Sequence, residues 1–391
     1  MYPERSAQKR IAVIGCTGSV GTSVLDVCRT YPEKFKITAL AASTGRKALP
    51  ELCREFKPHF AALQKTRDDL PENVQTLYGE DALMRLVGSE ETDHIVFASS
   101  GVAAVKALDY ALSLGKEISL ANKESALILG SRLTCAVRSG KVRPLDSEHN
   151  AVWQCLAGEK YDYVSQLFLT ASGGPFLHVP VEQLSQVSVG AAVAHPVWSM
   201  GQKISVDSAT MINKGIELLE AHYLFGLEAK KIHPVIQPGS KIHALVSFID
   251  GTTKMLMSPP DMRLASLTAL SWPERLNLRL DSIQPVRLDG LDLHFEAPKK
   301  ERFPGLFTAI DAAQAGEPYP VILIGADEAA VRLFLEGKIA FTDIAEIIAE
   351  VLEGYRGGCA DDIETRTELY LRCCEHTRTY ALQGRREKSW S

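Results

Sequence analysis

The sequence predicts an α/β protein with three parts: an N-terminal domain built on a parallel sheet, a central α+β domain and a C-terminal helical bundle. Short apolar runs alternate with helical patterns up to about residue 146, and the chain beyond about residue 301 is almost wholly helical in pattern. Its 391 residues are enough for two or three domains. We therefore expect domains at residues 1–146, 147–275 and 301–391, with a proline-containing linker at residues 276–300.

The N-terminal part contains repeated strand and helix patterns. Apolar runs that favour strands lie at residues 10–15, 36–43, 61–64, 94–99 and 117–121. Helical spacing of apolar residues occurs between them, at residues 22–31, 47–56 and 102–115. Strands that alternate with helices predict a Rossmann-like parallel sheet that is covered by helices on both faces.

The central and C-terminal parts lose this alternation. Strand-like runs lie at residues 166–174 and 241–258, the second with a hairpin turn at Asp250-Gly251, and a helical pattern covers residues 213–225. Further helical patterns lie at residues 307–316, 327–337, 342–355 and 361–383. We therefore expect a mixed central domain followed by a small helical bundle.

Composition excludes several classes of partner. The formal net charge of -5, with acidic and basic residues mixed along the chain, gives no basic stripe for nucleic acid or anionic lipid. The 8 cysteines form no CxxC pair, which favours reduced thiols. The first ten residues lack the apolar core of a secretory signal, and no segment has the ~20 apolar residues of a membrane span. We therefore expect a soluble cytoplasmic protein that acts on a small molecule, with no nucleic-acid or membrane partner.

A glycine-rich turn follows the first predicted strand and opens the first predicted helix. The glycines have the spacing GxxGxxG, a variant of the dinucleotide-binding pattern, and backbone N–H groups at such a helix start face a pyrophosphate. The spacing alone is weak evidence because glycines also make ordinary turns, but the order of strand, glycines and helix strengthens it. The residues expected to contact the cofactor here are Gly15, Thr17, Gly18, Ser19 and Val20.

The end of the second predicted strand bears on the choice of cofactor. An NAD site usually has an acidic residue there, about 20 residues beyond the glycines, to bind the ribose hydroxyls. This chain instead has two hydroxyls and two cations in residues 42–47, and we expect Gly45, Arg46 and Lys47 to contact a 2′-phosphate. The segment therefore favours NADPH; the alternative is a solvated loop with two surface charges.

Two acidic residues lie just beyond the last predicted strand of the N-terminal domain. Asp146 and Glu148 are two residues apart, which in an extended segment points both carboxylates to one side. Open α/β sheets hold ligands at this edge, and carboxylate oxygens suit Mg²⁺ or Mn²⁺. The pair is therefore a candidate metal site, although two such acids are more often solvated at the surface.

A polar face is predicted on the helix at residues 213–225. Asn213, Lys214 and Glu217 are three or four residues apart and therefore lie on one side of it. The alternative is a surface Lys214–Glu217 pair of little energetic consequence. The residues before the helix supply hydroxyls and a capping acid: Ser205, Asp207, Ser208 and Thr210.

Two loops of the central domain complete the candidate site. Ser172-Gly173-Gly174 follows an apolar strand and offers a hydroxyl and flexible amides to an anion. The segment 190–201 is a candidate lid, because it places His195 and Trp198 in a loop that ends at Gly201. Each loop also has an ordinary structural interpretation, as a common turn or as an aromatic-anchored surface loop.

These residues belong to a longer series of motifs. After the glycine turn come ANKES (121–125), DSEHNAVWQCL (146–156), LTASGGPF (169–176), HPVWSMGQKISVDSATMINKGIELLEAH (195–222) and PPDMR (259–263). The series resembles the 1-deoxy-D-xylulose 5-phosphate reductoisomerase family from about residue 10 to residue 355, and the block from His195 to Glu220 is highly specific.

The resemblance implies a homodimeric enzyme of the methylerythritol phosphate route to isoprenoids. It would use NADPH and Mg²⁺ or Mn²⁺, with Co²⁺ as a further candidate, to convert 1-deoxy-D-xylulose 5-phosphate to 2-C-methyl-D-erythritol 4-phosphate. The central domain would then be catalytic. The alternatives are a divergent paralogue that acts on another phosphorylated or phosphonate ketone, and a non-catalytic NADP-binding protein.

The resemblance also implies roles for individual residues. The metal ligands would be Asp146, Glu148 and Glu217, and the catalytic residues would be Lys123, Glu148, His195 and Lys214. The substrate contacts would be Ser147, Glu148, Ser172, His195, Trp198, Ser208, Asn213, Lys214 and Glu217, among which Ser172, Ser208 and Asn213 would bind the phosphate. The cofactor contacts beyond the segments above would be Asn122, Lys123, Glu124 and Gly201.

Three segments depart from the family pattern. Residues 237–243 read QPGSKIH where HPQSI before a histidine is usual, residues 324–328 read IGADE where NAANE is usual, and Val197 stands where asparagine is usual. None of them is a proposed metal ligand or phosphate donor. We expect them to affect lid motion, the contacts of the central and C-terminal domains, and substrate fit.

Overall fold

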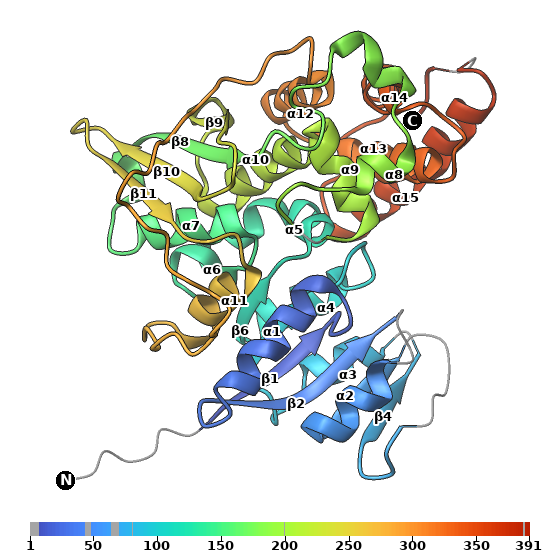
Figure 1. Ribbon diagram of the computed structural model, residues 1–391. Helices are drawn as coiled ribbons and strands as arrows, with labels where there is room; N and C mark the ends of the chain where they lie inside the picture. The colour runs from blue at the N-terminus through green and yellow to red at the C-terminus, as the bar shows by residue number, and fades with distance from the viewer. Residues whose placement is uncertain (1–7, 44–47, 64–69, 80, 199, 386–387) are drawn as a thin grey trace. The chain divides into compact units, whose positions relative to one another are not determined.

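The computed structural model describes residues 8–43, 48–63, 70–79, 81–198, 200–385 and 388–391 (Figure 1). The chain forms two compact units, one of residues up to Trp153 with Asp261–Gln284, the other of Gln154–Pro260 with Pro285–Ser391. The predicted fold class is confirmed, because a parallel sheet with helices, a second mixed sheet and a helical C-terminal region follow one another along the chain. The predicted domain boundaries stay a prediction.

In its described part, the first unit contains a seven-stranded parallel sheet with the order β4-β3-β2-β1-β5-β6-β7. The strands are β1 (Lys9–Ile14), β2 (Phe35–Ala42), β3 (Phe60–Leu63), β4 (Gln75–Tyr78), β5 (His94–Phe97), β6 (Glu117–Leu120) and β7 (Val142–Pro144). All five strands predicted for this part are confirmed, and β4 and β7 are additional. The chain adds strands to one side of β1 and then to the other, so the strand order reverses between β1 and β5, where open α/β sheets hold their ligands.

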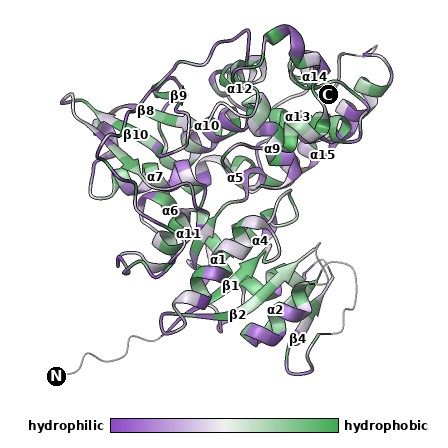
Figure 2. Cartoon of the chain, viewed as in Figure 1, coloured by the Kyte–Doolittle hydropathy of each residue, from purple (hydrophilic) through white to green (hydrophobic). Residues whose placement is uncertain are grey.

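Helices lie against this sheet through apolar faces. They are α1 (Ser19–Thr30), α2 (Ala48–Phe56), α3 (Ala82–Val87), α4 (Val105–Ser113), α5 (Lys123–Leu129), α6 (Thr134–Arg138), α11 (Met262–Ser271) and α7 (Ser147–Leu156), which runs past the end of the first unit. Side chains of α1, α2 and α11 share one core with β1 and β2. Figure 2 shows the strands β1 and β2 mainly in hydrophobic colours and α1 and α2 with mixed faces, the pattern expected of buried strands under amphipathic helices.

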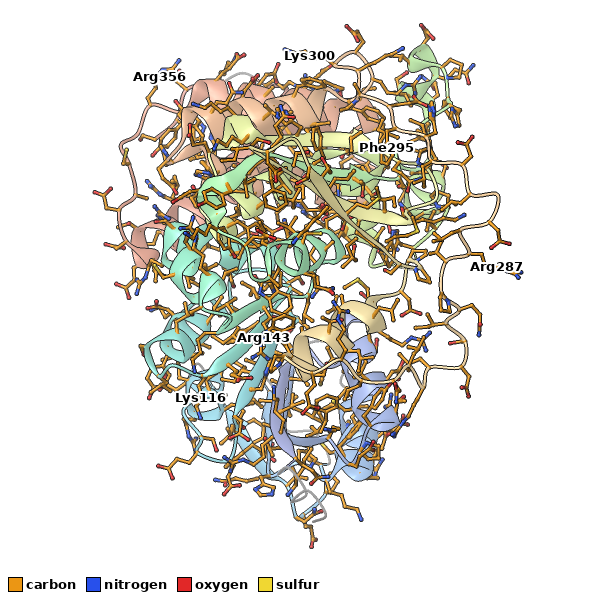
Figure 3. All side chains as sticks on the ribbon, turned by 90° about the vertical axis from the view of Figure 1, so that its left-hand side faces the viewer. Lys116, Arg143, Arg287, Phe295, Lys300 and Arg356 are labelled. Atoms are coloured by element: carbon orange, nitrogen blue, oxygen red, sulfur yellow. The ribbon has the colours of Figure 1, made fainter. Side chains whose placement is uncertain are left out.

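A charged network at the amino ends of the strands fastens α11 to the sheet. Arg143 of β7 (Figure 3) and Lys9 of β1 both pair with Glu117 Oε2, at 3.1 and 3.0 Å. Arg143 Nη1 also donates to the carbonyl oxygen of Ala269, and Lys9 Nζ to that of Leu270, each at 2.9 Å. Residues that the sequence analysis assigns to the central domain and the linker therefore pack in the first unit.

The second unit contains a smaller mixed sheet with the order β11-β10-β8-β9 among its described residues. Its strands are β8 (Val164–Ala171), β9 (Ile232–Ile236), β10 (Ile242–Phe248) and β11 (Thr253–Met257). β10 and β11 form the predicted hairpin around Asp250-Gly251. β9 lies at the edge, where the missing N–H of Pro234 costs only one possible bond.

Helices make up most of the second unit. They are α8 (Val189–Val193), α9 (Gln202–Thr210), α10 (Ile212–Phe225), α12 (Pro304–Ala315), α13 (Tyr319–Leu335), α14 (Phe341–Gly354) and α15 (Ile363–Leu382). α13 is buried along most of its length and packs against α9, α12, α14 and α15. α10 approaches α12 closely at Gly215, where an added Cβ would lie 2.3 Å from the Cβ of Ala309. Among the described residues, no helix has the length and apolar character required to span a membrane.

Candidate functional site

The glycine turn has the geometry that the sequence predicts. Gly15 follows β1 with φ +88°, and a Cβ there would lie 2.5 Å from the backbone of Ala98. Gly18 caps α1, and its N–H donates to the carbonyl oxygen of Gly15 at 3.1 Å. At Gly21 an added Cβ would lie 2.2 Å from the same oxygen. Side chains would therefore push the turn away from β1, whereas glycines keep the backbone amides close to the end of the sheet.

A pocket opens beside this turn at the carboxyl ends of the strands. It is lined by Gly15, Thr17 and Gly18, by the end of β2 up to Ser43, and by Ala98 to Ser100 after β5. Its position is the reversal of strand order between β1 and β5. Ser19 and Val20 begin α1 directly beyond the turn. The predicted phosphate-binding residues Gly45, Arg46 and Lys47 lie outside the described residues.

The pocket suits a dinucleotide by its own construction. Glycine, alanine and serine make up most of its lining, and Gly18, the N-cap of α1, is part of it. This combination admits the backbone of a pyrophosphate at the positive end of a helix dipole. Ser99 and Ser100, which follow β5, also line the pocket, and the sequence analysis did not single them out. Their position at the carboxyl end of a predicted parallel strand could have identified them, because ligands bind at that edge of such a sheet.

Asn122 links the end of β6 to the loop after β5, and Lys123 links it to the end of β7. The Asn122 side chain caps α5 by accepting from the N–H of Ser125 at 2.6 Å, and it donates to the carbonyl oxygens of Ser99 and Gly101 at 2.8 and 2.9 Å. Lys123 Nζ pairs with Asp146 at 2.7 Å. Glu124 lies in the first turn of α5. Asn122 thus orders the loops around the pocket, and Lys123 brings a cation to the carboxylate of Asp146.

Asp146 and Glu148 are close together for a reason other than the predicted one. The segment is not extended: α7 begins at Ser147, and Asp146 Oδ1 accepts from the N–H of Glu148 at 3.2 Å. Ser147 Oγ donates to Glu148 Oε2 at 2.5 Å, and His149 Nδ1 lies 3.5 Å from Asp146 Oδ1. The prediction of an extended DxE pair is wrong in its geometry, and a helix start places both carboxylates at the sheet edge instead.

In the second unit, the polar face of α10 is confirmed. Asn213 Nδ2 donates to Glu217 Oε1 at 2.5 Å, and Lys214 Nζ pairs with Glu217 Oε2. Lys214 and Glu217 are only 4% and 2% exposed, which excludes the alternative of a surface ion pair. Asn213 Oδ1 is buried and accepts no hydrogen bond in the described part of the chain. Such a face can offer an amide oxygen, an ammonium and a carboxylate to a polar ligand.

The turn after β8 and the loop before α9 meet at a serine and a histidine. His195 Nδ1 accepts from the N–H groups of Val197 and Trp198, at 3.1 and 2.9 Å, so the proton of the neutral ring lies on Nε2. Nε2 is 3.1 Å from Ser172 Oγ and donates to it. Burial lowers the pKa of His195 and favours this neutral form. Because Ser172 Oγ also accepts from the N–H of Gly174 at 3.2 Å, its own hydrogen points elsewhere, as a donor to an anion.

Further residues of the predicted substrate site surround this pair. The ring of Trp198 is tilted against that of His243, with centroids 6.3 Å apart. Gly201 caps α9, and Ser208 lies in the last turn of the same helix. The predicted lid segment 190–201 contains α8 and the His195 turn, while Ser199 lies outside the described residues.

One prediction about this region is wrong. Residues 205–210 are not an approach to a helix but are themselves helical, in α9, and α10 begins after Met211 with its left-handed φ of 61°. Asp207 therefore caps no helix; its carboxylate pairs with Lys203 at 2.8 Å. The sequence analysis predicted only the helix at residues 213–225 and missed α9.

Comparison with known proteins identifies the family. Family models for 1-deoxy-D-xylulose 5-phosphate reductoisomerase match residues 11–130, and models for its C-terminal domains match residues 142–225 and 257–380. The 1-deoxy-D-xylulose 5-phosphate reductoisomerase of Pseudomonas fluorescens strain SBW25 is 43% identical over 366 residues, which are 89% of this chain and 91% of the relative. The chain belongs to the 1-deoxy-D-xylulose 5-phosphate reductoisomerase family.

Solved structures of the reductoisomerase family have the same fold. The enzyme from Zymomonas mobilis in complex with NADPH matches with a TM-score of 0.87 at 33% identity, covering 96% of this chain and 99% of that chain. A DOX-P reductoisomerase in complex with NADPH, fosmidomycin and magnesium matches with a TM-score of 0.83 at 34% identity, covering 96% and 98% of the two chains. The predicted resemblance is therefore confirmed over nearly the whole length.

Proposed function

We propose that this chain catalyses the NADPH- and divalent-metal-dependent conversion of 1-deoxy-D-xylulose 5-phosphate to 2-C-methyl-D-erythritol 4-phosphate. The observation that carries the proposal is family membership combined with two intact polar constellations, one in each unit. The glycine turn and its pocket suit the dinucleotide, and the Ser172, His195 and α10 residues suit a phosphorylated polyol. Relatives in this family have been solved with NADPH, magnesium and the small molecule fosmidomycin.

The phosphate end of the substrate would be held by neutral donors. His195 keeps its Nε2–H on Ser172 Oγ, so the serine hydroxyl is oriented to donate outward. We assign Ser208 and Asn213 to the same phosphate. Binding energy from this non-reacting end then orients the carbons that rearrange, which lowers the barrier without contact at the reacting atoms.

The reacting end would be held by carboxylates and lysines. We assign Asp146, Glu148 and Glu217 as ligands of the divalent cation, Ser147 as a contact beside it, and Trp198 as a cover. The carboxylate oxygens of these three acids are the kind of ligand that Mg²⁺ and Mn²⁺ prefer. Lys123, which pairs with Asp146, and Lys214, which pairs with Glu217, would orient these carboxylates and meet the substrate hydroxyls. Bound NADPH supplies a hydride and the bound cation acts as a Lewis acid.

The cofactor contacts that we assign extend beyond the glycine turn. They include Gly45, Arg46 and Lys47 for the 2′-phosphate, and Asn122, Lys123, Glu124 and Gly201 around the nicotinamide.

We further propose a homodimer in the cytoplasm. Support for this location comes from the cysteines, which are all free thiols, as is usual in a reducing compartment. Sedimentation of the purified protein tests the dimer.

A coupled assay tests the proposed activity. Purified protein is mixed with NADPH, 1-deoxy-D-xylulose 5-phosphate and Mn²⁺, and loss of the reduced-nicotinamide absorbance is followed. We expect oxidation only when substrate and metal are both present, and we expect a chelator to abolish it and excess Mg²⁺ to restore it. NADPH that stays intact in the complete mixture contradicts the proposal, and faster oxidation with another ketone phosphate decides for a divergent paralogue.

A further inference from the structure

A second buried charge cluster lies between α9 and α13, outside the residues assigned to the reaction. Lys203 of α9 pairs with Asp207 one turn later, at 2.8 Å, and with Asp327 of α13. Asp327 is completely buried and Asp207 is 2% exposed. Asp207 Oδ1 accepts no hydrogen bond in the part of the chain that the structure describes. Two buried carboxylates thus share the ammonium of Lys203, whose side chain is 32% exposed.

The charge balance of the cluster is unusual. Two ionised carboxylates and one ammonium would leave a net negative charge in a buried place, which is costly. Burial, and after it the carboxylate of Asp327, raise the pKa of Asp207 well above its ordinary value, while Lys203 opposes the shift. A third carboxylate, Glu328, also raises it, although Glu328 is paired with Arg332 at 2.7 Å. The ammonium of Lys203 offsets part of this cost, because it pairs with both carboxylates and so joins the two helices.

The cluster is adjacent to the proposed phosphate site. Ser208 follows Asp207, and the carbonyl oxygen of Ser208 lies against Gly174, where an added Cβ would be 2.8 Å from it. Gly174 in turn donates its N–H to Ser172 Oγ. Asp207 therefore faces α13 while the next residue meets the 172–174 turn. A shift of α9 along α13 would move Ser208 relative to Ser172.

We propose that Asp327 is a positioning residue for substrate phosphate: through Lys203 and Asp207 it fixes α9 on α13 and so sets the distance between Ser208 and the 172–174 turn. The inference rests on the proposed function for the identity of the anion. It requires no contact between Asp327 and the substrate. It predicts that loss of the acid weakens phosphate recognition and leaves the dinucleotide site of the first unit unaffected.

Three variants of α13 test the inference. Asp327→Leu removes the partner of Lys203 on α13 and leaves only Asp207 of its own helix, so we expect KM for 1-deoxy-D-xylulose 5-phosphate to rise about tenfold, since small misplacements of binding groups have effects of this order. Inorganic phosphate, used as a competitive inhibitor, should weaken in parallel, while KM for NADPH stays within about twofold. Asp327→Asn keeps the shape and an acceptor for Lys203, and it should restore substrate KM nearly to that of the unaltered protein. Glu328→Gln, on the next residue, is the matched control and should change neither constant.

The readouts separate positioning from general stability. If Asp327→Leu is folded and its KM for the sugar phosphate is unchanged, or if both KM values rise together, the inference is overturned. Lys203→Met provides the same test should the leucine variant fail to fold. Calorimetric binding of inorganic phosphate keeps the test independent of turnover: an inactive unaltered protein would contradict the proposed function, whereas loss of phosphate binding only in the Asp327→Leu and Lys203→Met variants would still support positioning.

Discussion

Carboxylates in the two units have opposite surroundings. In the first unit, the carboxylate of Glu117 contacts nitrogen atoms of three side chains, Lys9, Arg143 and His94. In the second unit, Asp207 and Asp327 share the single ammonium of Lys203. The pKa shifts follow this balance: the His94 hydrogen bond and the two cations hold the pKa of Glu117 far below its ordinary value, whereas burial and a second acid raise that of Asp207.

The difference separates structural acids from acids near a ligand. Glu117 finds its partners inside its own unit. The two cations that pair with it, Arg143 and Lys9, also donate to the carbonyl oxygens of Ala269 and Leu270, so the network holds α11 on the sheet. Asp207 and Asp327 of the second unit are buried, and Asp207 precedes Ser208 of the proposed phosphate site. The cations around Glu117 therefore hold a helix on a sheet, whereas Lys203 and its two acids join α9 to α13.

The largest effect should come from Glu217, a buried acid of α10. Glu217→Gln should reduce turnover by about 10³-fold, or roughly 4 kcal/mol, because an amide is a poor ligand for a divalent cation. NADPH affinity, measured by fluorescence titration, should stay nearly unchanged because the dinucleotide pocket lies in the first unit. Near-ultraviolet circular dichroism serves as the folding control. A variant with the rate of the unaltered protein would remove Glu217 from the metal ligands.

The next effect should come from Glu117, and it should have the opposite character. Glu117→Gln leaves the buried Arg143 without its carboxylate and should destabilise the protein by about 3 kcal/mol, as removal of one partner from a buried pair usually does. Turnover per folded molecule should hardly change. Urea denaturation and the coupled assay measure the two quantities, and a loss of turnover in fully folded protein would break the comparison.

The smallest effect concerns pH. Burial is the main cause that lowers the pKa of His94 from 6.5 to about 4, so the unfolded chain takes up a proton that the folded protein refuses. Stability should therefore fall as pH drops below 6.5, by about 2 kcal/mol at pH 5. Glu117 adds to this loss only below its ordinary value of 4.5, because its folded pKa is lowered. The raised pKa of Asp207 acts in the other direction, since its contribution falls as pH rises above 3.8.

The His94→Asn variant tests whether this histidine causes the loss of stability below pH 6.5. Its urea midpoint should change less between pH 7 and pH 5 than that of the unaltered protein, because asparagine does not titrate. Parallel pH curves for the unaltered and His94→Asn proteins would show that this histidine does not control acid stability.

Much of the fold could be predicted from local patterns. The five strands predicted for the first unit and the hairpin at Asp250-Gly251 are confirmed, because a buried parallel strand and a tight turn leave signals within a few residues. β4 and β7 were missed because neither has an extended apolar run. β9 was missed because Pro234 argues against a central strand, and only the sheet order shows that β9 is an edge.

The site was predictable where its partners are neighbours in sequence. The Asn213, Lys214 and Glu217 face follows from helical spacing, and it is confirmed. Helix boundaries were harder to predict: α9 was missed, and it ends at Met211, which has a left-handed φ although no glycine marks the break. The pairing of Lys203 with Asp327 joins residues far apart in the chain, so no local pattern predicts it.

The return of Asp261–Gln284 to the first unit has a consequence for how the protein is made. Leu267, Ala269 and Leu270 of this segment belong to the same core as the first two strands. No contiguous fragment of the gene product therefore encodes the whole first unit, and a truncation after Trp153 would leave that core open to solvent. On the ribosome, the nascent nucleotide-binding half must wait for more than a hundred later residues before it can close, which makes it a natural client for chaperones.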